Sequence, residues 1–205
     1  MLKIILLRPG STEFDLQGRI VGTLDLPLSD AGSAEVTRAI AGLNGDQPTL
    51  VYHSPGQSAK ATAAAVAAAR GVKCKEIKAI QNINHGLWQG MLVEDVRRKQ
   101  PRVFKQWQEH PETVCPPEGE MISEVRQRVE AALAKLLKKH KQGTIMLVVP
   151  EPLAGIVRSL LQHMDVSEIW QTVGGCGAWD VIEVGPDAMQ LARPAASSAA
   201  QDESY

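Results

Sequence analysis

The residues that could most readily do chemistry follow a short apolar run near the amino terminus. Arg8, Ser11 and Thr12 come directly after Ile4 to Leu7, so a guanidinium and two hydroxyls lie where a buried strand is predicted to end. Arginine binds anions through charge-assisted hydrogen bonds, whereas hydroxyls at such a turn either cap local backbone or contact a ligand. Two roles are therefore open for Arg8, a structural ion pair and the binding of an anion, and Ser11 and Thr12 are expected to cap local backbone rather than to contact a ligand.

Four further polar residues follow other predicted strands or turns. His53 ends the run from Thr49 to Tyr52, and Glu151 follows the run from Ile145 to Val149. Ligands bind outside the carboxyl ends of parallel strands, so we expect these side chains to line one pocket with Arg8. Asn82 and His85 precede a Gly-Leu-Trp turn, and His85 is expected at the same mouth as His53. The two histidines could instead be satisfied side chains of the pocket wall.

A known family shares several of these short segments in the same order. The chain, from about residue 3 to residue 184, resembles the histidine phosphatase, or phosphoglycerate mutase-like, superfamily. The segments that carry the resemblance are Arg8-Pro9-Gly10-Ser11-Thr12, Gly18-Arg19 with Gly22, Leu24-Asp25-Leu26-Pro27-Leu28-Ser29-Asp30-Ala31-Gly32, Tyr52-His53-Ser54-Pro55, Gly86-Leu87-Trp88-Gln89-Gly90 and Pro116-Pro117-Glu118-Gly119-Glu120.

The resemblance implies a degenerate catalytic site. In the family, one histidine attacks phosphorus, two arginines and a second histidine hold the phosphoryl oxygens, and a carboxylate protonates the leaving group. Carried over position by position, these roles other than that of Arg8 fall on Pro9, Ser58, Asn82 and Glu151. Proline has no side-chain lone pair and an amide does not release a proton, so neither can take the family's role.

Two functions follow from this comparison of motifs. The first is a non-catalytic member of the family that binds a small ligand or a protein through the remodelled pocket, and is not an active phosphatase or mutase. The ligand-binding residues would be Arg8, Ser11, Thr12, His53, Asn82, His85 and Glu151. The alternative is an enzyme with altered chemistry, or a weak phosphatase, that uses His53, His85 or Glu151.

The elements that must position these residues alternate along the chain. Short aliphatic runs at Ile4 to Leu7, Thr49 to Tyr52, Ile145 to Val149 and Trp179 to Val184 predict buried strands. Helical patterns lie between them, at 30–43 behind a Ser29 cap, up to residue 70 behind a Ser58 cap, at 122–136 and at 153–164. This order predicts an α/β three-layer sandwich, with a mainly parallel central sheet and helices on both faces.

The length of the chain fits one large domain. We expect a phosphoglycerate mutase-like domain over residues 1–190, with a helical lid insertion at about 82–117 that is rich in tryptophan, phenylalanine and proline. The residues from 191 to 205 carry alanine, serine and acidic side chains without apolar periodicity, which predicts a flexible tail.

Composition narrows the possible partners. A formal net charge of −1 gives no field that would gather nucleic acid or a membrane surface, so neither partner is expected. Cys74, Cys115 and Cys176 are widely spaced, which predicts buried free thiols, no metal site and a cytoplasmic location. No cofactor is implied, and a homo-oligomer is possible.

Overall fold

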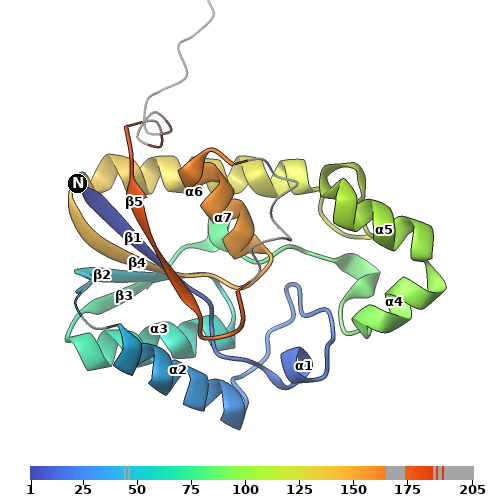
Figure 1. Cartoon of the computed structure of the whole chain (residues 1–205), viewed down its shortest axis with the longest axis horizontal. Helices are drawn as coiled ribbons and strands as arrows, with labels where there is room; N and C mark the ends of the chain where they lie inside the picture. The colour runs from blue at the N-terminus through green and yellow to red at the C-terminus, as the bar shows by residue number, and fades with distance from the viewer. Residues whose placement is uncertain (44, 46, 165–173, 187, 189–190, 192–205) are drawn as a thin grey trace, which may run out of the picture.

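A computed structural model of the 205-residue chain describes residues 1–43, 45, 47–164, 174–186, 188 and 191 (Figure 1). The predicted tail therefore lies, apart from residue 191, outside the described residues.

Five strands form one sheet in the order β3-β2-β4-β1-β5. Their bounds are β1 Leu2–Leu7, β2 Leu50–His53, β3 Lys73–Glu76, β4 Gly143–Val148 and β5 Trp179–Val184. The pairs β1 with β4, β4 with β2 and β2 with β3 are parallel, and β5 pairs with β1 in the antiparallel direction. The predicted mainly parallel sheet and the four strands read from apolar runs are confirmed.

Helices cover both faces of the sheet, as Figure 1 shows. Ile4 and Leu6 of β1 pack in a cluster with the helices α6 and α7, whereas Ile5 and Leu7 pack in a second cluster with α2 and α3. This alternation follows from the two-residue period of a strand. The bounds of these helices are α2 Asp30–Gly42, α3 Gln57–Arg70, α6 Ile122–Lys139 and α7 Leu153–Gln162. The predicted three-layer α/β sandwich is confirmed.

The strand β3 was not predicted because its sequence lacks an apolar signal. All four of its residues, Lys-Cys-Lys-Glu, are exposed, and the strand lies at the edge of the sheet. Charged residues at an edge discourage pairing with other chains, so composition there reflects solvent exposure rather than strand propensity.

The two predicted helix caps had different outcomes. Ser29 precedes α2, and its hydroxyl accepts a hydrogen bond from the Gly32 amide, as predicted. The prediction that Ser58 caps the next helix is wrong, because α3 begins at Gln57 behind Gly56. The carboxylate of Asp25 accepts the hydrogen bond from the Gln57 amide, so a residue distant in sequence caps the first turn of α3.

A group of short helices forms a side lobe at the right of Figure 1. Ile20, Trp88, Val96, Phe104 and Val114 form its separate apolar cluster, which explains why the aromatic residues gather in this stretch. The role of the lobe as a lid remains a prediction. The side lobe comprises η2 Gly86–Trp88, α4 Val93–Lys99, α5 Pro101–Glu109 and η3 Pro111–Thr113. Two further short helices, α1 Glu13–Leu16 and η1 Lys78–Ile80, precede it in the sequence.

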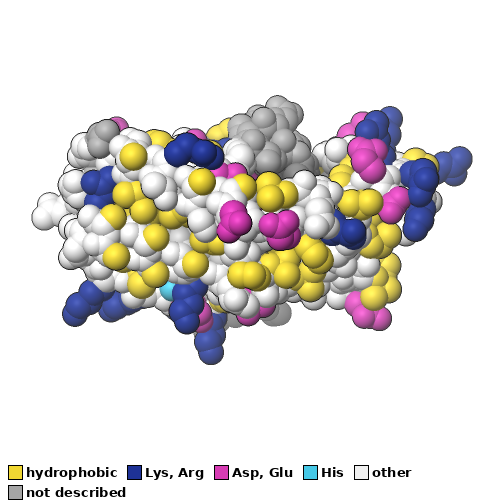
Figure 2. Space-filling view, turned by 90° about the horizontal axis from the view of Figure 1, so that it is seen from below, with side chains coloured by type: hydrophobic (Ala, Val, Ile, Leu, Met, Phe, Trp, Pro, Cys, Tyr) yellow, Lys and Arg dark blue, Asp and Glu magenta, His cyan; other side chains and the backbone are white. Residues whose placement is uncertain are grey.

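The surface carries charges of both signs. Figure 2 shows basic, acidic and apolar side chains interspersed over the face seen from below. Within the part of the chain that the structure describes, no helix combines the length and the apolar character that a membrane crossing requires.

The turn after β1 packs directly against the start of α2. A Cβ atom added to Gly32 would lie 2.1 Å from the carbonyl oxygen of Ser11, and that backbone atom has little room to move. We therefore expect Gly32→Ala to lower the free energy of unfolding by about 1 to 3 kcal/mol, despite the better helix propensity of alanine. Urea titration checks this, with the exposed Thr37→Ala in the same helix as control, and equal stabilities for both variants would contradict it.

Candidate functional site

A cavity of about 270 Å³ lies where β1 and β4 end, and we call it the Arg8 cavity. Of the predicted ligand-binding residues, Arg8, Thr12, Asn82 and Glu151 line it, together with Pro9 and Ser58. The complete lining is Arg8, Pro9, Gly10, Thr12, Asp15, Val21, Ser58, Asn82, Pro150, Glu151, Gly174, Gly175 and Cys176. Residues from five separate segments therefore meet at this edge of the sheet.

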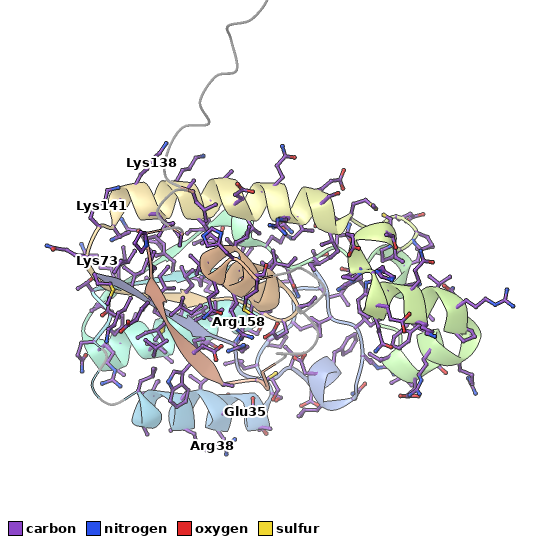
Figure 3. The ribbon with its side chains drawn as sticks, turned by 45° about the horizontal axis from the view of Figure 1, so that its top comes forward. Glu35, Arg38, Lys73, Lys138, Lys141 and Arg158 are labelled. Carbon is purple, nitrogen blue, oxygen red and sulfur yellow. The ribbon has the colours of Figure 1, made fainter. Side chains whose placement is uncertain are left out.

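Arg8 is held by two carboxylates. Its Nε atom donates to Glu151 Oε1 over 2.9 Å, and its Nη1 atom donates to Asp180 on β5. Asp180 also accepts a hydrogen bond of 2.6 Å from Arg158 Nη2 on α7, the helix from which Figure 3 shows Arg158 projecting. The positive charge of Arg8 is thus largely compensated, and its orientation is fixed. The ion-pair role predicted for Arg8 is confirmed, whereas its anion-binding role stays a prediction for a guanidinium that lines the cavity.

Glu151 sits in a shell of hydrogen-bond donors. Oε1 accepts from Arg8 Nε and from the Gly174 amide, at 2.9 Å and 3.4 Å, and Oε2 accepts from the Gly155 amide at 3.2 Å. Burial raises the pKa of Glu151, while the hydrogen bond and charge of Arg8 oppose that effect. A carboxylate has about four acceptor sites, so one is left after the three bonds that the described residues donate. A partly desolvated carboxylate in a cavity wall can act as a general base.

Asn82 closes the cavity rather than offering free polar atoms to a ligand. Its Nδ2 donates to the carbonyls of Gly22 and Glu151, at 3.1 Å and 3.2 Å. Its Oδ1 accepts from the Ile83 amide. Both amide protons are used, so Asn82 ties two loops together across the cavity.

The two hydroxyls after β1 have structural partners. Thr12 caps α1, where its Oγ1 accepts from the Asp15 amide and donates to the Asp15 carboxylate. The Ser11 hydroxyl lies 3.3 Å from the Ser29 hydroxyl, and Ser11 does not line the Arg8 cavity. Local capping is confirmed for Thr12, which also contributes to the wall, whereas the Ser11 hydroxyl contacts a side chain 18 residues away.

Neither predicted histidine lines the Arg8 cavity. His53 is buried, and its Nδ1 lies 2.8 Å from the carbonyl oxygen of Ser54. His85 is also buried and packs edge-on against Trp107 in the side lobe. Burial lowers the pKa of His85 to about 4, and the nearby negative charge of Glu120 only partly offsets this. Both histidines are therefore buried outside this cavity, and His85 Nδ1 makes no hydrogen bond among the described residues, so the prediction of satisfied wall residues is wrong for His85.

The lowered pKa of His85 makes stability depend on pH. The unfolded chain binds a proton at this histidine near pH 6.5, but the folded chain does so only near pH 4. Stability is therefore fully present above pH 6.5 and decreases as the pH falls toward 4, by roughly 2 to 3 kcal/mol in total.

We expect this loss to be absent from a His85→Phe variant, which keeps an aromatic ring beside Trp107 but cannot titrate. Urea unfolding at pH 7.5 and 4.5 provides the comparison, with the exposed His110→Phe as control. The same pH dependence in His85→Phe and in the wild type would refute the assignment.

The cysteine prediction is wrong in one respect. Cys74, Cys115 and Cys176 are free but exposed, whereas buried thiols were expected. Cys176 lines the cavity, yet desolvation of its thiol, with the charges of Asp15 and Glu35, raises its pKa to about 12. A thiol that stays protonated at neutral pH is a poor nucleophile, so Cys176 is not a candidate for attack.

Sequence reasoning missed Asp180 and Gly174. Asp180 is 172 residues from Arg8 and belongs to no motif, so its place beside Arg8 depends on the pairing of β5 with β1. Gly174 approaches Arg8 so closely that a Cβ atom would lie 2.8 Å from Cζ. The Gly-Gly pair at 174–175 indicates a close approach of the backbone to some other group, but it does not say which group that is.

Known proteins resemble the chain in sequence and in structure. A model of the histidine phosphatase superfamily (branch 1) matches residues 4–196. Phosphoserine phosphatase 1 of Hydrogenobacter thermophilus is 33% identical over 171 residues, which cover 83% of this chain and 81% of that protein. Glucosyl-3-phosphoglycerate phosphatase of Mycobacterium tuberculosis is 25% identical over 183 residues, or 85% and 81% of the two chains.

Solved structures agree on the fold. A mycobacterial glucosyl-3-phosphoglycerate phosphatase complexed with VO3 superposes with a TM-score of 0.83 at 23% identity, over 91% of this chain and 93% of the other. The expectation of a non-catalytic protein is contradicted by the sequence relatives, which are named as phosphatases. They favour the alternative that the sequence left open, an enzyme with altered chemistry or weak phosphatase activity.

Proposed function

Since the chain belongs to the histidine phosphatase superfamily (branch 1), we propose that it is a phosphomonoester hydrolase of altered chemistry, in which Glu151 activates water. We also propose that Pro9 and Glu151 occupy the positions of the two family histidines, as the order of the motifs implies. The names of the relatives support a phosphomonoester as the substrate, since they include phosphoserine and glucosyl-3-phosphoglycerate phosphatases.

The observation that carries this proposal is the environment of Glu151. Its carboxylate lines the Arg8 cavity, is oriented by three donors and keeps one acceptor site that no residue of the described chain uses. Its raised pKa places it nearer to neutral pH, where a general base is most effective. Of the three candidates His53, His85 and Glu151, it alone lies in the wall of this cavity.

Two donors remain for the phosphoryl group. Within the described part of the chain, Arg8 Nη2 and the Ser58 hydroxyl make no hydrogen bond, and both residues line the cavity. They would hold phosphoryl oxygens while the carboxylates of Glu151 and Asp180 keep the guanidinium in place. One compensated arginine binds a dianion weakly, so a high Michaelis constant is expected.

The reaction we propose is a single displacement. The oxygen of a water molecule forms a bond to phosphorus as the bond from phosphorus to the ester oxygen breaks, and Glu151 takes one proton of the water. That proton, or one from solvent, then neutralises the leaving alkoxide, which leaves an alcohol and inorganic phosphate. The Asn82 amide cannot protonate the leaving group, so the reaction should be slow.

The test is phosphate release by the purified protein from a panel that includes phosphoserine, a sugar phosphate and p-nitrophenyl phosphate. We expect release below about 1 s⁻¹, at the low end for enzymes, because the proposed alignment places Pro9 at the position of the nucleophile and Asn82 at that of the acid. Release no faster than that by the Glu151→Gln variant, for every ester of the panel, would refute the proposal.

A further inference from the structure

A second cavity, of about 470 Å³, shares Asn82 with the Arg8 cavity, and we call it the polar cavity. Its volume falls within the usual range of small-molecule sites, roughly 300 to 1,000 Å³. It is bounded by η1 and by the start of α6, and Figure 1 shows that end of α6 next to the side lobe. The lining is Thr23, Lys78, Gln81, Asn82, Asn84, Gly119, Glu120, Glu124 and Arg128.

One part of this lining is a rigid frame. Arg128 donates to both carboxylate oxygens of Glu120, at 2.7 Å and 3.0 Å, and to the backbone carbonyls of Ala79, Gln81 and Asn82. Asn84 is held by the Gly86 amide and by the Glu118 carbonyl. The polar groups of this frame are thus bonded to one another and to nearby backbone, so the frame fixes the shape of the cavity.

Another part of the lining has unused hydrogen-bonding capacity. Among the residues that the structure describes, the side chains of Lys78 and Gln81 make no hydrogen bond or ion pair. Glu124 uses only Oε2, which accepts from the Met121 amide, so Oε1 is open. An ammonium, an amide and a carboxylate oxygen thus offer both donors and acceptors at the cavity surface.

The chemistry of the lining restricts the ligand. The positive charges of Lys78 and Arg128 equal in number the negative charges of Glu120 and Glu124, so neither an anionic nor a cationic group is favoured. The lining has no aliphatic or aromatic residue, so its apolar surface consists of carbon atoms of polar side chains and of the backbone. A neutral group with several hydroxyls matches a surface that both donates and accepts.

A third cavity, of about 230 Å³, links the other two. It shares Val21, Ser58, Asn82 and Pro150 with the Arg8 cavity, and Thr23, Gln81 and Asn82 with the polar cavity. The three cavities are therefore adjacent, and Asn82 lies where they meet, since it lines all three. We propose that the polar cavity binds the polyhydroxylated alcohol portion of the substrate, which makes the substrate a sugar or polyol phosphate. This inference rests on the proposed function, because it assumes that the phosphoryl group enters the Arg8 cavity.

The experiment compares the affinities of esters that share a phosphoryl group and differ in the alcohol. Dissociation constants for sorbitol 6-phosphate, phosphoserine and phenyl phosphate are measured by NMR titration of the full chain, and phosphate release is followed in the same samples. We expect sorbitol 6-phosphate to bind about 10-fold or more tightly than phenyl phosphate, since each added hydrogen bond is worth about 3- to 10-fold.

Two variants connect that preference to the polar cavity. Gln81→Leu and Lys78→Met should each weaken sorbitol 6-phosphate about 3- to 10-fold relative to phenyl phosphate. The matched controls are Gln127→Leu and Lys138→Met on α6, neither of which lines the cavity, and Figure 3 shows Lys138 on the outer side of that helix. The controls should leave the preference unchanged.

The outcomes separate the two proposals. Equal affinity for the three esters, a preference for phosphoserine, or identical effects of Gln81→Leu and Gln127→Leu would overturn the assignment of the polar cavity, even if phosphate is released. The expected preference without phosphate release from any ester would overturn the proposed hydrolase and leave a binding site for polyhydroxylated phosphates.

Discussion

Replacing Glu151 with glutamine is expected to lower kcat for phosphate release by about 10²- to 10⁴-fold, the usual contribution of general acid–base catalysis. The amide has nearly the same size but cannot accept a proton from water at neutral pH. It also places an NH₂ group where the carboxylate accepts hydrogen bonds from Arg8 and from two backbone amides. The measurement is steady-state phosphate release at saturating substrate.

The pH profile distinguishes a chemical role of Glu151 from a structural one. A general base must be unprotonated, so the wild-type rate should rise with pH through the pKa of Glu151, which burial raises above its ordinary value. This rise should be missing from the residual activity of Glu151→Gln. The exposed Glu183→Gln is the control, and a variant that keeps both the rate and the rise would exclude Glu151 as the base.

Replacing Arg8 with lysine should lower kcat/KM by about 10²- to 10³-fold, which is the usual effect of losing one preorganised donor to a developing negative charge. A lysine ammonium cannot place separate donors on Glu151, on Asp180 and in the cavity, as the planar guanidinium does. The Michaelis constant should rise as well, because Arg8 is the one cation that lines this cavity among the described residues.

Arg38→Lys provides the matched control, because Arg38 is exposed on α2 and Figure 3 shows it on the outer side of the helix. Circular dichroism should establish that Arg8→Lys is folded, since a buried ion pair that loses its geometry can destabilise the protein. A folded Arg8→Lys protein with the kinetic constants of Arg38→Lys would show that the phosphoryl group binds elsewhere.

The sequence predicted those parts of the fold that depend on burial. The runs at Ile4 to Leu7 and Ile145 to Val149 are apolar because β1 and β4 lie at the centre of the sheet, with helices on both faces. The edge strand β3 has no buried face, so its sequence carried no such signal. The start of α3 was misplaced because its first amide is capped by Asp25, 32 residues away.

Only those residues of the site that belong to sequence motifs could be predicted. Arg8, Asn82 and Glu151 were placed by their segments and meet in one cavity. Asp180 contacts Arg8 because β5 pairs with β1 in the antiparallel direction, and no local sequence pattern predicts that pairing. The balance of charge at Arg8, and thus the weak attraction for a phosphate dianion, depends on that pairing.

The most direct test of Glu151-activated water is the stereochemistry at phosphorus. A thiophosphate monoester, made chiral at phosphorus by sulfur and two oxygen isotopes, is hydrolysed in water that carries the third oxygen isotope, and the configuration of the inorganic thiophosphate is determined. A single in-line displacement by water predicts inversion. Net retention would reveal a covalent phosphoenzyme formed in two displacements, and it would contradict direct attack by a water molecule that Glu151 activates.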